Sequence, residues 1–172
     1  MMLFRSGQIR LEDYLKTLQT KIFYNTQYFN PNISLVELAQ TSFTPEGHAQ
    51  YGNIYMKGAL VAGLLDIKLL ELSNGKRGLV DVINDFAKKY GPNRSFDEAT
   101  FFEEFANETY PEINGFFEKY VKTSETLPFK EYYFKIGVNY DEDTSEFTLV
   151  KQPTEEQLKL RNKWMQQIII KS

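Results

Sequence analysis

The pattern of hydrophobic and polar positions is centred on one long segment, residues 51–72. Its middle part, residues 59–65, carries no charged or strongly polar residue on any side of a helix. A helix of about six turns with that pattern is expected to contact protein all round. The pattern therefore predicts a buried central helix around which the remaining chain packs.

Helical spacing of apolar residues recurs along most of the chain and predicts seven or eight helices in total. The expected buried positions outside the central helix are Leu11, Leu15, Leu18 and Ile22; Leu79, Val82, Ile83, Phe86 and Tyr90; Phe101, Phe102 and Phe105; Ile113, Phe116, Phe117, Tyr120 and Val121; Tyr132, Tyr133 and Ile136; and Leu158, Trp164, Met165 and Ile168.

Residues that favour caps and turns place the boundaries of these helices. Capping boxes, in which the first and fourth residues satisfy free amide groups of a helix start, are expected at residues 34–37, 95–98 and 154–157. Turns, loops or helix ends are expected at residues 5–7, 30–32, 42–47, 74–75, 91–92 and 111, and Pro128 and Gly137 should begin and end a helix.

From Asn139 the pattern changes, because residues 141–144 are polar and Phe147 and Leu149 alternate with polar residues. This favours a solvated turn and a short strand confined to residues 145–150. The predicted fold class is therefore all-α. We divide the chain into a helical subdomain, residues 1–138, and a C-terminal extension, residues 139–172, consisting of a turn, a short strand and a helix.

Composition narrows the function classes. The 172-residue chain is 42% hydrophobic, enough for one core, and its net charge of −3 comes without a basic block, so nucleic acid is not an expected partner. It has no cysteine and one histidine. Residues 1–7 have no signal-peptide pattern, and no apolar run reaches the roughly 18 residues of a membrane span. We expect a soluble protein of undetermined compartment.

Several short motifs resemble, in order, the later part of the catalytic domain of the glycyl-aminopeptidase family, gluzincin-type zinc metallopeptidases that often carry a PDZ domain. The resemblance covers residues 3 to about 138. Its motifs are Leu3-Phe-Arg-Ser-Gly7, Ser42-Phe43, Tyr55-Met-Lys57-Gly58-Ala, Leu64-Leu-Asp66, Asn74-Gly-Lys76, Leu79-Val-Asp-Val82, Phe116-Phe-Glu-Lys-Tyr-Val121, Leu127-Pro-Phe-Lys-Glu-Tyr132 and Gly137. The chain departs from the family pattern at Asn53, Ile54, Leu70, Gly78, Val80 and Thr123.

The resemblance implies an all-α subdomain like the C-terminal half of thermolysin-like peptidases. It also implies that the family's zinc motif, His-Glu-x-x-His, lies upstream of residue 1. A single histidine, His48, cannot supply the two imidazoles of that motif. We therefore expect no metal site in this chain, zinc in a full-length parent, and no activity from the chain alone.

Three residues at the start of the central helix are the candidate site. By resemblance, Tyr55 is the catalytic residue that donates a hydrogen bond to the oxyanion beside zinc; from spacing alone it is a core tyrosine. Tyr51, one turn earlier, lines the substrate pocket or packs at its rim. Lys57 orients a substrate carboxylate or forms a structural ion pair. Gly58 is expected to let another backbone come close.

Other polar residues have mainly structural interpretations. Asp66 lies in an apolar run, so we expect it to be paired or to cap a helix, because an isolated buried carboxylate is unfavourable. His48 is expected in an exposed loop. Residues 141–143 are acidic but lack the glycine and final glutamate of a calcium-binding EF-hand loop.

Two functions remain open. The chain is the C-terminal part of a zinc aminopeptidase, with the upstream zinc-binding half and a peptide substrate as partners, or a non-catalytic helical binding or scaffolding module that kept the fold. In either case an uncovered face near the start of the central helix favours a partner or self-association.

Overall fold

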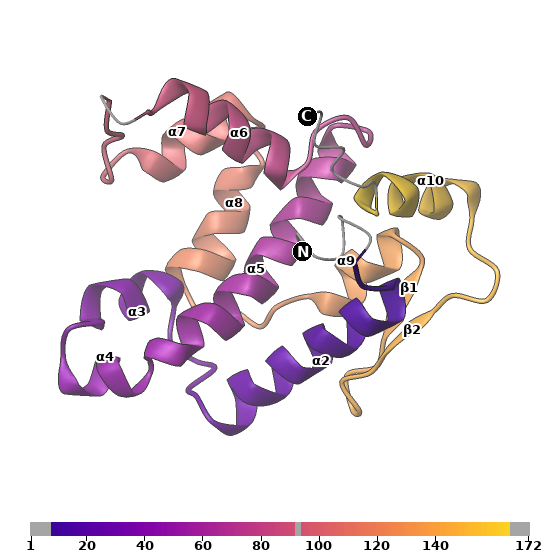
Figure 1. The fold of residues 1–172 in the computed structure, drawn as a ribbon, viewed down its shortest axis with the longest axis horizontal. Coiled ribbons are helices and arrows are strands. Elements are labelled where there is room, and N and C mark those ends of the chain that lie inside the picture. Colours follow the sequence, from indigo (N-terminus) through magenta and orange to yellow (C-terminus); the bar gives the residue numbers. More distant parts are fainter. Residues whose placement is uncertain (1–7, 92–93, 166–172) are drawn as a thin grey trace.

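The computed structural model describes residues 8–91 and 94–165. Its centre is α5, Tyr51–Leu72, with the bounds that the hydrophobic pattern predicts. Helices α2, α3, α4, α6, α9 and α10 all contact α5, which runs through the middle of the molecule (Figure 1). These described residues are mostly helical and form one small sheet, which agrees with the expected all-α class.

Before α5, residues 8–50 form three helices near the N-terminal end of α5. Helix α2, Leu11–Gln27, buries Leu11, Leu15, Leu18 and Ile22 as predicted. Helix α3, Leu35–Thr41, begins at Ser34, whose hydroxyl accepts the expected hydrogen bond from the Glu37 amide. The prediction of a loop at residues 42–47 is wrong in part, because Pro45–Ala49 form the short helix α4, which Thr44 caps.

The chain after α5 turns at Asn74 and Gly75, as predicted, and continues into α6, Leu79–Lys89. Both Asn74 and Gly75 have positive φ. The capping box expected at residues 95–98 is wrong. Helix α7, Phe101–Glu108, begins only after Thr100, and Asp97 instead accepts a hydrogen bond from the Ala99 amide in the preceding turn. Helix α8, Ile113–Phe117, runs directly into a π-helix, Glu118–Lys122.

The last part of the chain is α9, Phe129–Lys135, a hairpin of β1, Val138–Tyr140, and β2, Phe147–Leu149, and α10, Glu155–Trp164. The prediction that strand is confined to residues 145–150 is wrong, because Val138–Tyr140 pairs antiparallel with Phe147–Leu149. Strand β1 begins directly after Gly137, whose positive φ ends α9. The capping box at Thr154 and Gln157 is confirmed.

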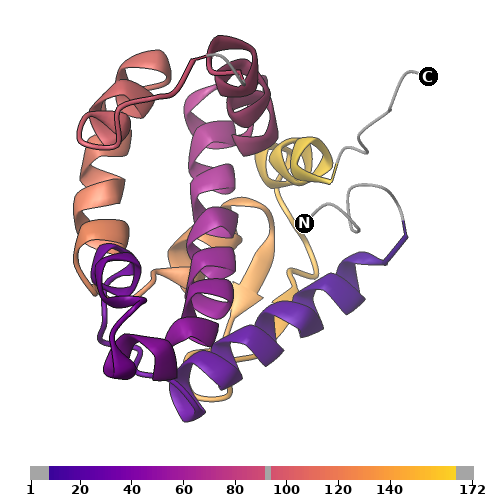
Figure 2. The ribbon, with the colours of Figure 1, turned by 60° about the vertical axis from the view of Figure 1, so that its left-hand side comes forward.

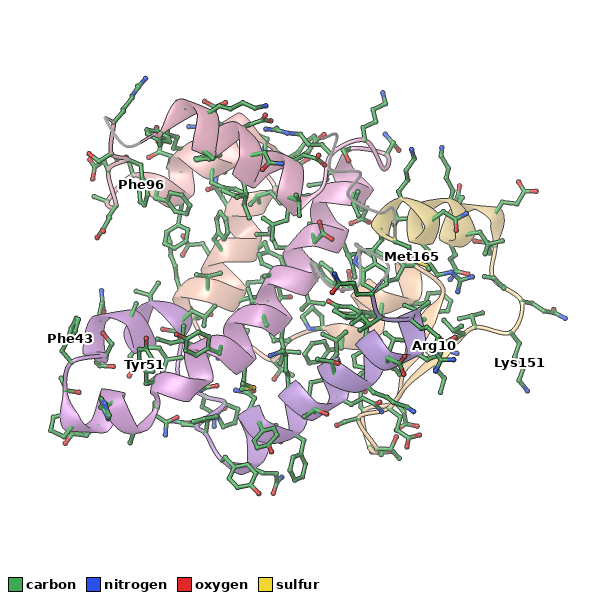
Figure 3. All side chains as sticks on the ribbon, in the orientation of Figure 1. Arg10, Phe43, Tyr51, Phe96, Lys151 and Met165 are labelled. Carbon is green, nitrogen blue, oxygen red and sulfur yellow. The ribbon has the colours of Figure 1, made fainter. Side chains whose placement is uncertain are left out.

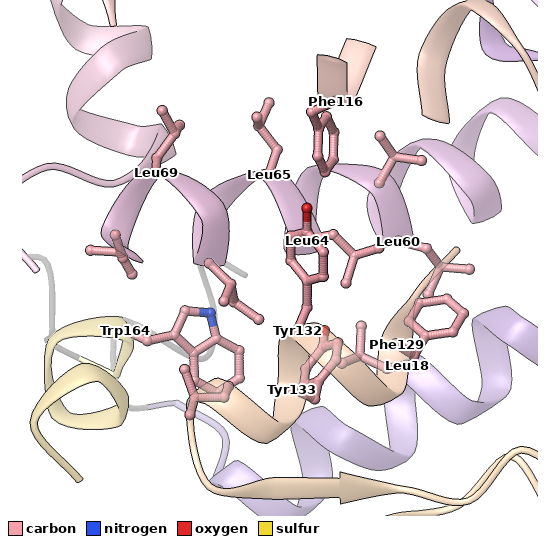
Figure 4. Packing of buried hydrophobic residues seen from close by; sticks show 14 of the residues in the cluster. Leu18, Leu60, Leu64, Leu65, Leu69, Phe116, Phe129, Tyr132, Tyr133 and Trp164 are labelled. Atoms are coloured by element: carbon pink, nitrogen blue, oxygen red, sulfur yellow. The ribbon is translucent and has the colours of Figure 1, made fainter. Parts of the chain in front are cut away.

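One hydrophobic core joins these elements. Trp164 from α10 and Tyr133 from α9 meet beside α5, with ring centroids 6.2 Å apart, and Leu60, Leu64 and Leu69 of α5 lie in the same cluster (Figure 4). Seen from a second direction, α2 crosses the lower half of α5 while α6, α7 and α10 gather at its upper half (Figure 2). The two ends of α5 therefore have different surroundings.

The described residues form nine α-helices rather than seven or eight, since α4 was expected as a loop. Ile83 and Leu158, which the helical spacing placed in the core, are exposed. The turn predicted at residues 5–7, the stop at Pro92 and the buried position at Ile168 lie outside the described residues.

Candidate functional site

The two candidate tyrosines share one exposed face of α5. Tyr51 and Tyr55 are one turn apart, with 48% and 59% of their surfaces exposed, and their hydroxyl oxygens are 3.3 Å apart. Their rings meet edge to face, with centroids 5.7 Å apart. Tyr51 lies at the end of the molecule formed by α3 and α4 (Figure 3). The interpretation of Tyr55 as a core tyrosine is wrong, because more than half of it is exposed.

The Tyr51 hydroxyl also affects the acidity of its neighbour. The hydrogen bond and the charge interaction between the two phenols raise the pKa of Tyr55 above its ordinary value of 10.0. Tyr55 therefore keeps its proton at neutral pH. A neutral phenol in this position can donate a hydrogen bond to an oxyanion that develops on a bound molecule.

Small residues continue the open face along α5. Gly58 and Ala62 follow Tyr55 at helical spacing, and both are only partly buried. A Cβ atom at Gly58 would meet nothing within 4 Å among the described residues, so the expected close approach of another backbone is not present in them. Ala59 is also only partly buried. Protein contact all round residues 59–65, as the sequence suggested, is therefore incomplete.

Lys57 lies away from this face. It follows Tyr55 by two residues, about 200° around the helix axis. Lys57 is only 2% exposed, and its ammonium group donates hydrogen bonds to the carbonyl oxygens of Pro31 and Ile33, at 2.9 and 2.6 Å. Among the described residues it forms no ion pair, so the expected structural ion pair is replaced by bonds to carbonyl groups. The structure does not bring Lys57 together with the two tyrosines.

A chain of asparagine side chains holds the same loop, and sequence reasoning did not identify it. The Asn25 amide nitrogen donates to the Asn53 side-chain oxygen at 2.5 Å, and the Asn53 nitrogen donates to the carbonyl of Asn30 at 2.9 Å. Asn53 is fully buried within α5. An asparagine on the buried side of an apolar helix was the available signal, since a buried amide needs hydrogen-bond partners.

Asp66, in the second half of α5, caps the start of α6. One carboxylate oxygen accepts a hydrogen bond from the Leu79 amide at 2.7 Å. The residue before Leu79 is Gly78, where a Cβ would lie 2.7 Å from that same oxygen. The expectation that Asp66 is paired or capping is confirmed, and glycine at position 78 makes room for the carboxylate.

The remaining polar candidates are on the surface. His48 is exposed, as expected, although it belongs to α4 rather than to a loop. One carboxylate oxygen of Asp141 accepts from the amides of Asp143 and Thr144, which closes the turn before β2. Within residues 8–91 and 94–165 there is no group of three or more metal-ligating side chains.

No family model, curated protein or solved structure matches this chain. In the described part of the chain, no helix has both the length and the apolar character needed to cross a membrane.

Proposed function

We propose that the chain is the C-terminal helical part of a zinc aminopeptidase catalytic domain of the gluzincin type, and that Tyr55 is its oxyanion donor. The observation that carries the proposal is the open face of α5, where two exposed tyrosines with touching hydroxyls lead into Gly58 and Ala62. The remainder of α5 is largely buried. An exposed phenol on an otherwise buried helix suits a group that acts on something outside this chain.

The described residues do not fit a zinc site of their own, so the metal belongs to the proposed upstream half. When bound there, zinc would activate a water for attack on a peptide carbonyl. Tyr55 would donate its phenolic proton in a hydrogen bond to the oxyanion that forms. Tyr51 would line the substrate pocket and hold the Tyr55 hydroxyl in place.

The test is Tyr55→Phe in the full-length parent. A donor that acts mainly in the transition state should lower kcat by about 10²–10³-fold when it is removed, with little change in substrate binding. The measurement is kcat on an N-terminal glycyl or alanyl amide, together with zinc content and Tm. Because the Tyr55 side chain is exposed, Tm should not change.

Tyr51→Phe is the matched control, since it removes the neighbouring hydroxyl and leaves Tyr55 its own. We expect a smaller loss of kcat. An unchanged kcat in Tyr55→Phe would remove Tyr55 from the mechanism. The chain alone should bind no stoichiometric zinc and cleave none of these substrates.

A non-catalytic helical binding module is the second candidate, and a group of exposed rings favours it. Phe23, Tyr24 and Tyr28, at the end of α2, are exposed and contact one another, with ring centroids 5.2 to 6.0 Å apart. Exposed aromatic groups of this kind mark contact surfaces. A parent without His-Glu-x-x-His upstream, in which the chain self-associates in sedimentation experiments, would favour this second function.

A further inference from the structure

A pocket of about 410 Å³ lies on the side of α5 away from Tyr55. It is bounded by the end of α2, the loop at residues 31–32, the segment at residues 124–127 and the hairpin. Ile22, Leu60 and Phe129 supply apolar wall, and Asn25, Lys57 and Thr126 supply polar groups. Its volume falls within the roughly 300–1,000 Å³ typical of small-molecule sites.

Lys57 is the one cationic side chain among the described residues that line this pocket. A buried ammonium is costly unless an anion or enough hydrogen bonds compensate for its lost hydration. An ammonium group has three N–H donors, and the carbonyls of Pro31 and Ile33 accept two of these bonds. One donor therefore remains for a ligand.

The charge of Lys57 is incompletely balanced. Burial lowers the pKa of Lys57 below its ordinary value of 10.5, and the more distant Glu37 only partly opposes this effect. An anion bound beside the ammonium would raise that pKa again. The other charged groups that line the pocket, Glu125 and Glu142, are both exposed acids.

We propose that this pocket binds a small apolar zwitterion, a free amino acid or a short peptide, with its carboxylate on Lys57. The apolar side chain of the ligand packs against Ile22, Leu60 and Phe129. Glu125 and Glu142 attract its ammonium group and disfavour ligands with two or more negative charges. This site is separate from the proposed chemistry at Tyr55 and does not depend on it.

The experiment titrates the ¹⁵N-labelled chain with four probes and follows amide shifts around the pocket. The probes are leucine, the dipeptide Leu-Leu, isovalerate, which lacks the amine, and isoamylamine, which lacks the carboxylate. We expect one or both zwitterions to bind more tightly than isovalerate, and isoamylamine not to bind. Binding of neither zwitterion at millimolar concentration, or equal binding of isovalerate, would overturn the proposal.

Two variants examine the pocket from different sides. Lys57→Met should weaken the zwitterion by at least about tenfold, the usual effect of losing a charged hydrogen bond. Because this change also frees the loop at residues 31–33, Thr126→Trp serves as a second variant, which fills the pocket from an exposed position and leaves the bonds of Lys57 intact. Unchanged affinity in both variants would contradict the site.

Two further readouts distinguish a binding role from a structural one. Saturating zwitterion should raise the pKa of Lys57, measured on its side-chain nitrogen, whereas a purely structural lysine would not respond. The double variant Glu125→Gln/Glu142→Gln should weaken zwitterion binding and should not weaken isovalerate binding, because isovalerate has no ammonium group for the two carboxylates to attract. Tyr55→Phe should not alter either affinity, so this proposal and the proposed function fail independently.

Discussion

The two halves of α5 each bury one charged residue, and they use it differently. Lys57 in the first half donates to two loop carbonyls, and Asp66 in the second half accepts from the first amide of α6. A helix start carries partial positive charge, so it complements a carboxylate, whereas carbonyl groups alone leave an ammonium without a counter-ion. Helices α6 and α10 also gather at the second half, while the first half leaves Tyr51 and Tyr55 open (Figure 2). We infer that the second half stabilises the fold and that the first half binds.

The largest effect is expected from Asp66→Ala. It removes the carboxylate that caps α6 and leaves a partly buried amide without its partner, so the free energy of unfolding should fall by about 2–3 kcal/mol. Asp66→Asn, which keeps an oxygen acceptor but no charge, should cost less. Urea denaturation followed by circular dichroism measures both. Equal stability of Asp66→Ala and the unsubstituted chain would mean that this cap does not stabilise the second half of α5.

Gly78→Ala tests the same contact from the other side. Its Cβ would lie 2.7 Å from the Asp66 oxygen, so the carboxylate or the turn must move, at a cost of about 1–2 kcal/mol in unfolding free energy. Gly115→Ala is the matched control, because a Cβ there meets nothing within 4 Å. If both variants were equally stable, the close packing at Gly78 would be unimportant.

Gly58→Ala should change the free energy of unfolding in the opposite direction. Gly58 is inside a helix, and a Cβ there meets no atom within 4 Å, so alanine should raise the free energy of unfolding by about 0.5–1 kcal/mol. Thermal melting of the isolated chain is the measurement. Destabilisation in the monomeric chain would show that the first half of α5 is already covered.

The smallest effect concerns pH. Burial opposes ionisation of Glu71, but hydrogen bonds from Lys135 and Lys68 outweigh it, so the pKa of Glu71 is lowered from 4.5. The stabilisation that ionised Glu71 contributes to folding is therefore complete above about pH 4.5. It is lost as the pH falls through the lowered pKa of Glu71 in the folded chain. Because Glu71 is about one-third exposed, we expect only a few tenths of a kcal/mol. Glu71→Gln should remove this part of the acid dependence in denaturation measured from pH 3 to 6.

Local sequence signals predicted most of the helices, turns and caps, but they did not predict the contacts between distant parts of the chain. The bounds of α5, the turn at Asn74 and Gly75, and the capping box at Thr154 follow from residues next to one another in sequence. The box expected at Ser95 has the right residues, but no helix begins directly after it. β1 is only three residues long, too short for its alternation to indicate a strand without its partner. At the site, the shared face of Tyr51 and Tyr55 follows from helical spacing.

The partners of buried polar groups could not be predicted in this way. Lys57 reaches carbonyls 24 and 26 residues earlier in the chain, and Asp66 reaches an amide 13 residues later. Backbone groups carry no residue signature, so a sequence does not show which of them a side chain will bind. A charged or amide residue on an apolar helix indicates only that some partner exists.

The loop between α2 and α3 has a consequence for chain length. The carbonyls of Asn30, Pro31 and Ile33 each accept a bond from a side chain fixed on α5. Adding one residue within this segment would shift those carbonyls away from Asn53 and Lys57, although an ordinary surface loop tolerates insertions at little cost. Natural or engineered variation in length is therefore not expected at residues 30–33.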